Sequence, residues 1–385
     1  MQTKTAGPGT FTAFDLSSVP SPCFVTDLAR LDDNLAVLKD VSDRSGARIL
    51  TALKAFSLWS VAPLVSRYLD GACASGLYEA RLARTRYNGL VSCFAPAYKP
   101  QDMAELADLC DHIIFNSPQQ ITRFAPQLRT GGAEIGLRVN PCLPLGEVEK
   151  YDPAAPRSRL GVPHHQIEDH HFDQISGLHI HSLCEQGFAE LEQIIGVITP
   201  LLDRSAGRLS WLNLGGGHMI TAPDYDRDAL VACLSHLKQR YQLDIYLEPG
   251  TAIAFDAGIL VGEVLDVIEN DGPVAILDIS ATCHMPDVLE APYRPGLLAE
   301  ADAGPLVRLG GPSCLAGDVI GDYRFARPPE PGQRLAFLDQ AHYSMVKTTM
   351  FNGVPLPAIA LWDSRTGKVE VIREFTYADF EGRLS

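Results

Sequence analysis

The sequence lacks the features that would place the chain in a membrane or in an oxidising compartment. It has no run of about 18 apolar residues, and its start, MQTKTAGPGTFTAFDLSS, has no apolar segment typical of a secretory signal. The nine cysteines are an odd number and form no CxxC pair, which argues against a disulfide framework and a structural zinc site. We therefore predict a cytoplasmic protein whose cysteines are mostly small buried residues.

Clustered positive charge is scarce as well. The chain has 32 Lys and Arg against 47 Asp and Glu, which gives a net charge of −15 at pH 7. Binding to nucleic acid phosphates requires clustered Lys and Arg, so nucleic acid is not an expected partner. A cationic small molecule suits an acidic chain, and 385 residues suffice for a large barrel and a smaller second domain.

The sequence does contain a regular alternation of strand-like and helical stretches. The strand-like runs are RILTALKAF, GACAS, LVSCFAPA, HIIFNS, EIGLRVNP, SGLHIHS, WLNLGGG and DIYLEPG. Most are separated by stretches with helical apolar spacing, such as residues 58–69 and 188–202. Strands that alternate with helices favour a parallel sheet, so eight such units between residues 48 and 250 predict a (β/α)8 barrel. The longer connection over residues 141–174 indicates a functional loop.

The sequence texture changes after Gly250. Gly and Pro break up the strand-like runs ILVGEVLDVIE, PVAILDIS, PLVRLGG, QRLAFLD and KVEVIREF, which predicts an antiparallel β domain. Near the N-terminus, SPCFVTD predicts a strand that could pair with this domain, followed by a helix from Asp27 or Leu28. We predict an α/β protein with a TIM barrel over residues 29–258 and a β-sandwich-like or β-barrel-like domain formed by residues 1–28 and 259–385.

Polar residues gather at the ends of the predicted barrel strands. They are Lys54 at the first strand, Arg138 and Asn140 at the fifth, His179 and His181 at the sixth, the glycines from Gly215 at the seventh and Glu248 at the eighth. Each has an ordinary structural explanation when taken alone; Lys54 can pack its stem on the strand end and extend its amine to water. Because the active site of a (β/α)8 barrel lies at the carboxyl ends of its strands, the set predicts one site.

The chemistry of this set indicates pyridoxal phosphate. A triple glycine at a strand-to-helix junction lets backbone N–H groups approach a phosphate. Lys54 lies between apolar flanks, and the loss of water that they predict would keep its amine reactive toward a carbonyl. A carboxylate such as Glu248 can hold a proton on a pyridine nitrogen, and an imidazole can lie flat on the ring.

Several longer stretches resemble a known family. The matching stretches are ALKAFS, GLHIHSLCE, LNLGGGH, LEPGTA, GPSCLAGD and AHYSMVKTTMFNG, and the resemblance covers nearly the whole chain. The chain resembles the alanine racemase-fold (fold type III) pyridoxal 5′-phosphate enzymes, within them the ornithine, diaminopimelate and arginine decarboxylases, and most of all their carboxynorspermidine and carboxyspermidine branch. The resemblance implies a homodimeric decarboxylase of a cationic, carboxylated polyamine in polyamine biosynthesis.

The resemblance also implies roles for individual residues. Those implied to hold the cofactor are Lys54 as the Schiff-base lysine, His181 stacked on the ring, Glu248 at the ring nitrogen, and Gly215, Gly216, Gly217, Gly250 and Tyr343 at the phosphate. Cys314 is implied to enter the site from the partner subunit and to return a proton to the substrate carbon after carbon dioxide leaves. Without the resemblance, Cys314 reads as a buried structural cysteine.

Three positions depart from the ornithine and diaminopimelate branches. HSLC stands where those branches have HxGS, Thr251 stands in place of an arginine, and Leu315 stands where an acidic residue lies beside the cysteine. These departures favour the carboxynorspermidine branch and leave the detailed phosphate contacts open.

Anionic side chains would be needed to bind the amines of such a substrate. Candidates are Asp287, Asp318 and, in the long loop, Glu147 and Glu149, all of which could equally be solvated surface residues. Arg138 could support Glu248 or bind a substrate carboxylate. Diaminopimelate, ornithine and arginine decarboxylases remain alternatives, as do a non-catalytic pyridoxal phosphate carrier and a Schiff-base aldolase acting on a sugar phosphate.

Overall fold

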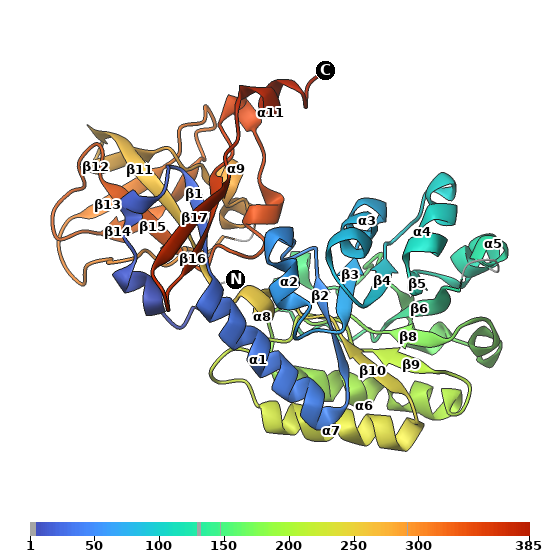
Figure 1. Cartoon of the computed structure of the whole chain (residues 1–385). Coiled ribbons are helices and arrows are strands. Elements are labelled where there is room, and N and C mark those ends of the chain that lie inside the picture. Colours follow the sequence, from blue (N-terminus) through green and yellow to red (C-terminus); the bar gives the residue numbers. More distant parts are fainter. Residues whose placement is uncertain (1–4, 129–131, 147, 291) are drawn as a thin grey trace. The chain divides into compact units, whose positions relative to one another are not determined.

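The computed structural model describes residues 5–128, 132–146, 148–290 and 292–385. The chain divides into two compact units, a barrel unit of residues 34–253 and a β unit of residues 1–33 and 254–385 (Figure 1). The predicted boundaries, after residues 28 and 258, lie a few residues from these divisions. The first division falls inside helix α1 (Leu28–Ser45) and the second inside the short helix α8 (Thr251–Ala254).

Eight parallel strands close into a barrel, as the sequence predicts. They are β2 (Arg48–Ala52), β3 (Gly71–Ala74), β4 (Leu90–Phe94), β5 (His112–Phe115), β6 (Glu134–Asn140), β8 (Gly177–His179), β9 (Trp211–Asn213) and β10 (Asp244–Leu247). They pair in chain order around the ring, and β10 pairs with β2 to close it. The short strand β7 (Val162–Pro163) pairs with β6 outside the ring.

The barrel interior is filled by a large aromatic side chain. Trp211 forms a buried cluster with Leu50, Ile114 and Tyr246. A Cβ atom on Gly177 would lie 2.0 Å from the Trp211 ring, and one on Gly136 would lie 2.4 Å from it. These two strand positions require glycine because the indole occupies the space of a side chain, so the interior is a packed core.

Helices connect most of the barrel strands. The α helices are α1, α2 (Ala62–Val65), α3 (Leu77–Arg86), α4 (Met103–Leu109), α5 (Pro118–Leu128), α6 (Phe188–Ser205), α7 (Arg227–Tyr241) and α8, and the 3₁₀ helices are η3 (Trp59–Val61), η4 (Pro100–Asp102), η5 (Glu149–Tyr151), η6 (His164–Gln166) and η7 (Asp169–Gln174). Helix α6 confirms the helix predicted over 188–202. The helix predicted over 58–69 is wrong in length, because Pro63 has no N–H to donate and is tolerated only in the first turn of α2.

The β unit is built around an eight-stranded sheet. Its strands are β1 (Cys23–Asp27), β11 (Gly258–Glu269), β12 (Pro273–Leu277), β13 (Leu306–Gly310), β14 (Val319–Arg324), β15 (Arg334–Leu338), β16 (Ala358–Asp363) and β17 (Lys368–Arg373), and its helices are η1 (Gly9–Ala13), η2 (Leu16–Ser18), α9 (Ala281–His284), α10 (Asp287–Glu290), η8 (Met345–Lys347), η9 (Phe351–Gly353) and α11 (Tyr377–Glu381). The sheet runs β14-β13-β12-β11-β1-β16-β17, with β15 paired to β11. Two of its pairings, β1 with β16 and β12 with β13, are parallel, so the prediction of a purely antiparallel domain is corrected to a mixed sheet.

Strand β1 confirms the predicted pairing of the N-terminal strand with the C-terminal β domain. It pairs antiparallel with β11 and parallel with β16, and all five of its residues are buried. Because side chains alternate along a strand, Phe24 packs into one hydrophobic cluster of the unit and Val25 into another. In the second cluster Phe11 and Phe14 pack on Trp362, with ring centroids 5.3 and 4.9 Å from it.

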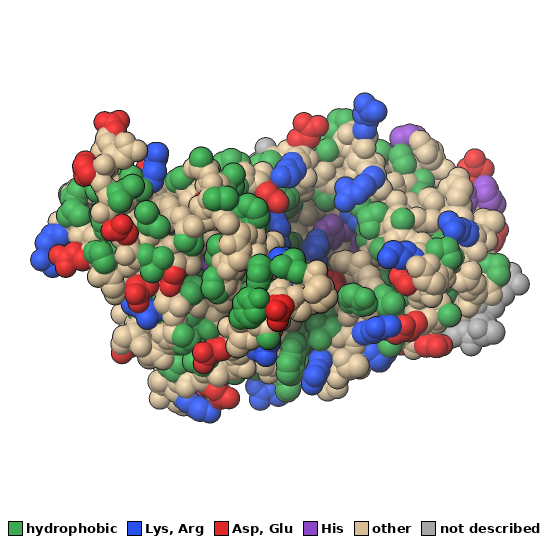
Figure 2. Space-filling view, turned by 90° about the horizontal axis from the view of Figure 1, so that it is seen from above, with side chains coloured by type: hydrophobic (Ala, Val, Ile, Leu, Met, Phe, Trp, Pro, Cys, Tyr) green, Lys and Arg blue, Asp and Glu red, His purple; other side chains and the backbone are tan. Residues whose placement is uncertain are grey.

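The surface carries charges of both signs. On the face seen in Figure 2, acidic and basic side chains are interspersed, so on that face the net charge of −15 is not gathered into one acidic area. Across the described ranges, the helices are too short or too polar to cross a lipid bilayer.

Candidate active site

Five neighbouring barrel strands bring the predicted polar residues to one edge. Strands β6, β8, β9, β10 and β2 follow one another around the ring and run parallel, so their carboxyl ends meet. The pairing register puts Arg138 beside His179 and His179 beside Asn213. Within two residues of the strand ends follow His181 after β8, Gly215 after β9, Glu248 after β10 and Lys54 after β2.

Lys54 lies in the turn that follows β2. Its neighbours Leu53 and Ala55 are fully buried, whereas the Lys54 side chain is exposed. The sequence predicted that the apolar flanks would strip water from the amine, and the structure corrects this, because the flanks pack into the protein and the lysine does not. The positive charge of Lys54 nevertheless acts on the site, since it helps to lower the pKa of the buried Glu248 carboxyl.

Glu248 is a buried carboxylate held by two side chains from adjacent strands. Its Oε2 lies 3.1 Å from His179 Nε2, and its Oε1 accepts a hydrogen bond of 2.7 Å from Asn213 Nδ2. Burial by itself would raise the pKa of Glu248, but the interactions with His179, Asn213 and Lys54 outweigh it and lower that pKa. Burial lowers the pKa of His179, so His179 is a neutral imidazole that donates its Nε2–H to an ionised carboxylate.

The glycine turn after β9 has a backbone that other residues could not adopt. Gly215 has φ +68° and Gly217 has φ +85°, and a Cβ atom on Gly217 would lie 2.2 Å from the Leu183 carbonyl oxygen. Gly215 N donates to Asn213 Oδ1 at 2.8 Å, and Gly216 N donates to His181 Nδ1 at 2.8 Å. Two of the three N–H groups therefore serve protein acceptors, a use that the prediction of a phosphate-binding turn did not include.

His181 belongs to a stack of flat side chains. The rings of Phe94 and His179 are 5.5 Å apart, those of His179 and His181 are 6.2 Å apart, and the Arg138 guanidinium lies 4.4 Å from the Phe94 ring. Burial, followed by the charges of Lys54 and Arg138, keeps the pKa of His181 well below its usual range. Because its Nδ1 accepts the Gly216 N–H, His181 is a neutral imidazole with the proton on Nε2.

Arg138 is buried and bound to the chain rather than open to solvent. Its Nη2 donates a 2.7 Å hydrogen bond to the His181 carbonyl oxygen, and burial lowers its pKa to about 10. These contacts support a role in fixing the stacked histidine. A direct contact of Arg138 with a substrate carboxylate stays a prediction.

Gly250 has a packing role that the sequence did not reveal. A Cβ atom there would lie 2.5 Å from the Ala55 Cβ, so the glycine lets the segment after β10 approach the turn that carries Lys54. The Ala52 N–H donates to the Pro249 carbonyl across the same approach. A phosphate contact of Gly250 stays a prediction.

The donor atoms of His179, His181 and Glu248 lie within 4.8 Å of one another, a grouping that could hold a metal ion. Each Glu248 oxygen lies at hydrogen-bond distance from a side-chain donor, and the His181 Nδ1 accepts a backbone N–H. The group therefore fits the described protein contacts without an ion.

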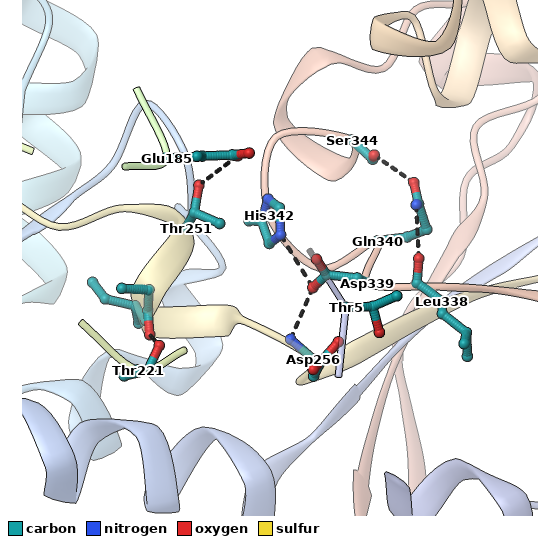
Figure 3. A network of polar contacts seen from close by, with 12 residues as sticks. Thr5, Glu185, Thr221, Thr251, Asp256, Leu338, Asp339, Gln340, His342 and Ser344 are labelled. Atoms are coloured by element: carbon teal, nitrogen blue, oxygen red, sulfur yellow. Dashed lines mark hydrogen bonds and ion pairs between the residues drawn. The ribbon is translucent and has the colours of Figure 1, made fainter. Parts of the chain in front are cut away.

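One of the departures noted in the sequence, Thr251, binds the residue that directly follows another. Thr251 Oγ1 donates a 3.2 Å hydrogen bond to the Glu185 carboxylate, as Figure 3 shows. Glu185 directly follows HSLC and has a left-handed backbone with φ +54°. Glu185 was not among the predicted site residues, although it ends the stretch GLHIHSLCE that carries part of the resemblance.

Tyr343 lies in a tightly bonded turn of the β unit. Tyr343 and Asp339 both have positive φ, +47° and +57°. Within this unit Asp339 Oδ1 accepts from the Asp256 N–H at 2.8 Å and lies 3.1 Å from His342 Nε2, as drawn in Figure 3. Ser344 is bonded to Gln340 at 2.6 Å, so the turn that presents Tyr343 is rigidly held.

Cys314 is exposed, which contradicts its interpretation as a buried structural cysteine. Its backbone N–H donates to Asn352 Oδ1 at 2.6 Å, and Leu315 beside it is 44% exposed. The nine cysteines all lie in the described ranges and are free thiols.

Two of the four predicted acidic residues, Asp318 and Asp287, already have partners in the protein. Asp318 is buried and accepts hydrogen bonds from the hydroxyls of Ser280 and Ser313 at 2.8 and 2.6 Å and from two backbone N–H groups. Asp287 is paired with Lys347 at 2.5 Å. Glu149 is exposed at the start of η5, and Glu147 lies outside the described residues.

Comparison with known proteins agrees with this geometry. The family described as "Pyridoxal-dependent decarboxylase, C-terminal sheet domain" matches residues 23–341. The chain belongs to the pyridoxal-dependent decarboxylases. It is 41% identical over 374 residues to carboxyaminopropylagmatine decarboxylase of Synechocystis, covering 96% of each chain. It is 36% identical over 379 residues to carboxynorspermidine/carboxyspermidine decarboxylase of Campylobacter jejuni, covering 95% of this chain and 98% of that one.

A solved structure extends the similarity to three dimensions. Carboxynorspermidine decarboxylase of Campylobacter jejuni, complexed with norspermidine, matches with a TM-score of 0.87 at 34% identity, over 95% of this chain and 100% of that one. This pyridoxal-dependent decarboxylase has residues that suit its cofactor. The buried, ionised Glu248, the neutral His181 and a glycine turn that any side chain would block meet at one barrel edge.

Proposed function

We propose that this pyridoxal-dependent decarboxylase acts on a carboxylated polyamine. The observation that carries the proposal is the similarity to the carboxynorspermidine decarboxylase complexed with norspermidine. The buried Glu248 carboxylate, held by His179 and Asn213 beside the neutral His181 ring, supports the pyridoxal phosphate chemistry. When bound, pyridoxal phosphate supplies a ring that takes up the electron pair left on the substrate carbon as carbon dioxide departs. The favoured substrates are carboxynorspermidine and carboxyspermidine, whose products norspermidine and spermidine belong to polyamine biosynthesis.

The barrel residues have separate roles in this proposal. The exposed Lys54 amine would bind the aldehyde carbon of the cofactor, and Glu248 would hold a proton at the ring nitrogen. His181 would pack against the ring face. Gly215, Gly216, Gly217 and Gly250 would lie at the phosphate, together with Tyr343 of the β unit.

Cys314 would serve the site of a partner subunit in a homodimer. The bond between the substrate carbon and its carboxylate breaks, and the Cys314 thiol supplies the proton that takes the place of carbon dioxide. The exposure of Cys314 and of the apolar Leu315 beside it supports an interface at this loop. The nine free thiols support a reducing compartment, and we propose the cytoplasm.

Carboxyaminopropylagmatine is a second candidate substrate, because the relative of that name is 41% identical to this chain. Both candidates carry the same amino- and carboxyl-bearing propyl group, so the reacting end is shared. They differ at the far end, where the agmatine part carries a guanidinium group instead of an ammonium group. The proposed chemistry at Lys54, Glu248 and Cys314 is the same for both.

A substrate panel tests the proposed function. The purified holoenzyme is given carboxynorspermidine, carboxyspermidine, carboxyaminopropylagmatine, diaminopimelate, ornithine and arginine, and carbon dioxide and the product mass are measured. We expect kcat/KM for the first two to exceed that for the amino acids by at least about a hundredfold. The highest value for carboxyaminopropylagmatine would select the second candidate, and release from the amino acids alone would refute both.

Mixed subunits test the homodimer. Lys54→Ala and Cys314→Ala subunits are each expected to have little activity. If Cys314 serves the partner's site, a mixed dimer contains one site with both residues intact, so mixing the two variants restores activity. A mixture that stays inactive although mixed dimers are detected would show that Cys314 does not act across an interface.

A further inference from the structure

Three polar residues of the barrel form a layer above the buried Trp211 side chain. His179, Asn213 and Glu248 come from β8, from β9 and from the end of β10, which are consecutive strands. Asn213 is fully buried and His179 is 1% exposed. The sequence singled out His179 as a strand-end residue, but no role in the proposed function uses it or Asn213 directly.

We propose that His179 and Asn213 are positioning residues that fix the orientation and the ionised state of Glu248. The proposal rests on the proposed role of Glu248 as the partner of the cofactor ring nitrogen. Each residue binds a different carboxylate oxygen, His179 at Oε2 and Asn213 at Oε1, so neither oxygen can rotate without breaking a hydrogen bond. Hydrogen bonds to the charged form keep a buried carboxylate ionised.

His179 is itself held so that its proton points at Glu248. Its ring is stacked between Phe94 and His181, at interplanar angles of 24° and 14°. Its Nδ1 has no hydrogen-bond partner among the described residues, which fits a neutral ring with the proton on Nε2. The charged and titratable groups around Glu248 are Lys54, Cys73, His112, Arg138, His179 and His181. Among them, His179 lies 3.1 Å from a carboxylate oxygen of Glu248.

Asn213 connects the carboxylate to the glycine turn. Its Nδ2 donates to Glu248, while its Oδ1 accepts the Gly215 N–H. The Glu248 N–H also donates to the Gly215 carbonyl at 2.7 Å. The Asn213 amide therefore binds both Glu248, proposed for the ring nitrogen, and the glycine turn, proposed for the phosphate. The positions of the two groups that would hold opposite ends of the cofactor are coupled through this side chain.

The test measures the protonation of the cofactor ring nitrogen in the holoenzyme. Wild type and variants are loaded with pyridoxal phosphate labelled with ¹⁵N in the ring, and the ¹⁵N resonance is recorded together with kcat. In His179→Leu we expect the resonance to move toward that of an unprotonated pyridine and kcat to fall about tenfold to a hundredfold. His179→Gln can place an amide N–H near the Nε2 position and should keep kcat within roughly threefold of wild type.

Matched variants separate positioning from folding. His112→Leu also removes a buried histidine of the barrel, one that stacks on Trp211 at 4.5 Å, and it should leave the resonance unchanged. If His179→Leu does not fold, His179→Asn replaces it, because the shorter amide cannot reach Glu248. A wild-type resonance and kcat in whichever of these two folds would overturn the proposal.

Glu248→Gln distinguishes this proposal from the one on which it rests. If Glu248→Gln moves the resonance and the His179 variants do not, only the positioning role fails. If Glu248→Gln leaves the resonance unchanged, the proposed role of Glu248 fails, and the positioning role that rests on it fails as well.

Discussion

The barrel unit and the β unit each bury a carboxylate, and they do so differently. In the barrel, Glu248 follows a parallel strand and is held by one side chain on each oxygen. In the β unit, Asp318 accepts two hydroxyl groups and two backbone N–H groups, which ties together the segments that carry Ser280 and Ser313. Burial of a charged residue therefore does not by itself indicate a site; its place at the edge of a parallel barrel does.

Removal of the Lys54 amine is the largest expected break of the barrel site. We expect Lys54→Ala to lose a cofactor absorbance band at about 420 nm and to lower kcat by roughly a thousandfold or more. The measurement is a spectrum before and after borohydride, followed by an assay. Lys39→Ala, at an exposed helix lysine paired with Asp43, is the control and should match wild type. Wild-type turnover in Lys54→Ala would remove this lysine from the mechanism.

Loss of the Cys314 thiol should affect the chemistry and spare the fold. Because the side chain is exposed, we expect Cys314→Ala to change Tm by less than about 2 °C and to keep the cofactor spectrum. Loss of a proton donor should lower kcat roughly a hundredfold. Cys142→Ala, at the other exposed cysteine, is the matched control. A large fall in Tm without a specific loss of kcat would return Cys314 to a structural role.

Acid should destabilise both units through one buried histidine in each. Burial lowers the pKa of His218 in the barrel unit and of His284 in the β unit to about 4. Below the unfolded pKa of about 6.5, each histidine is protonated in the unfolded chain but stays neutral in the folded chain. The free energy of unfolding therefore falls as the pH drops from 6.5 toward 4, by about 3 kcal/mol for each histidine at pH 4. Urea unfolding at pH 7 and pH 4.5 measures this; His218→Gln and His284→Gln should each flatten the dependence, and equal slopes in wild type and both variants would contradict it.

Substitution of Asp318 has the smallest expected effect, and it distinguishes a structural role of this carboxylate from a contact with substrate. Asp318→Asn keeps the shape but replaces one acceptor oxygen by an NH2 group that faces hydrogen-bond donors, so we expect a loss of about 1–3 kcal/mol in unfolding free energy with little change in KM. Asp322→Asn, which breaks only an ion pair with the half-exposed Arg308, should cost less than about 1 kcal/mol. A rise in KM without loss of stability in Asp318→Asn would instead support the predicted contact with substrate.

Local patterns were enough to predict the barrel and not the sheet of the β unit. Each barrel strand is a short run flanked by a helix, and its partner is the next run along the chain. In the β unit, β1 pairs with β16 more than 300 residues later, and no local signal gives the direction of that pairing. Strand β14 was missed because Gly321 and Asp322 interrupt its apolar pattern. Strand β16 has the uninterrupted apolar run AIALW up to Trp362 and was missed although its local pattern was available.

The positions of the site residues at the strand ends could be predicted from the sequence, but their hydrogen-bond partners and their exposure could not. The strand-end rule found Lys54, His181 and Glu248, because parallel strands share an edge. The exposure of Lys54 fits the ordinary explanation of a strand-end lysine and not the predicted loss of water, since sequence does not say which way a turn residue points. Asn213 was missed because a buried amide in a strand looks the same whether it binds a core neighbour or a carboxylate.

The position of β1 in its sheet also has a consequence for synthesis of the protein. Strand β1 is synthesised before both of its partners, because β11 and β16 begin only at Gly258 and Ala358. At roughly 5–20 residues per second the first partner follows after about 10–50 s, a period long enough for the barrel residues between them to fold. During that time the apolar strand with Phe24 and Val25 has neither of the two strands that cover it in the folded sheet.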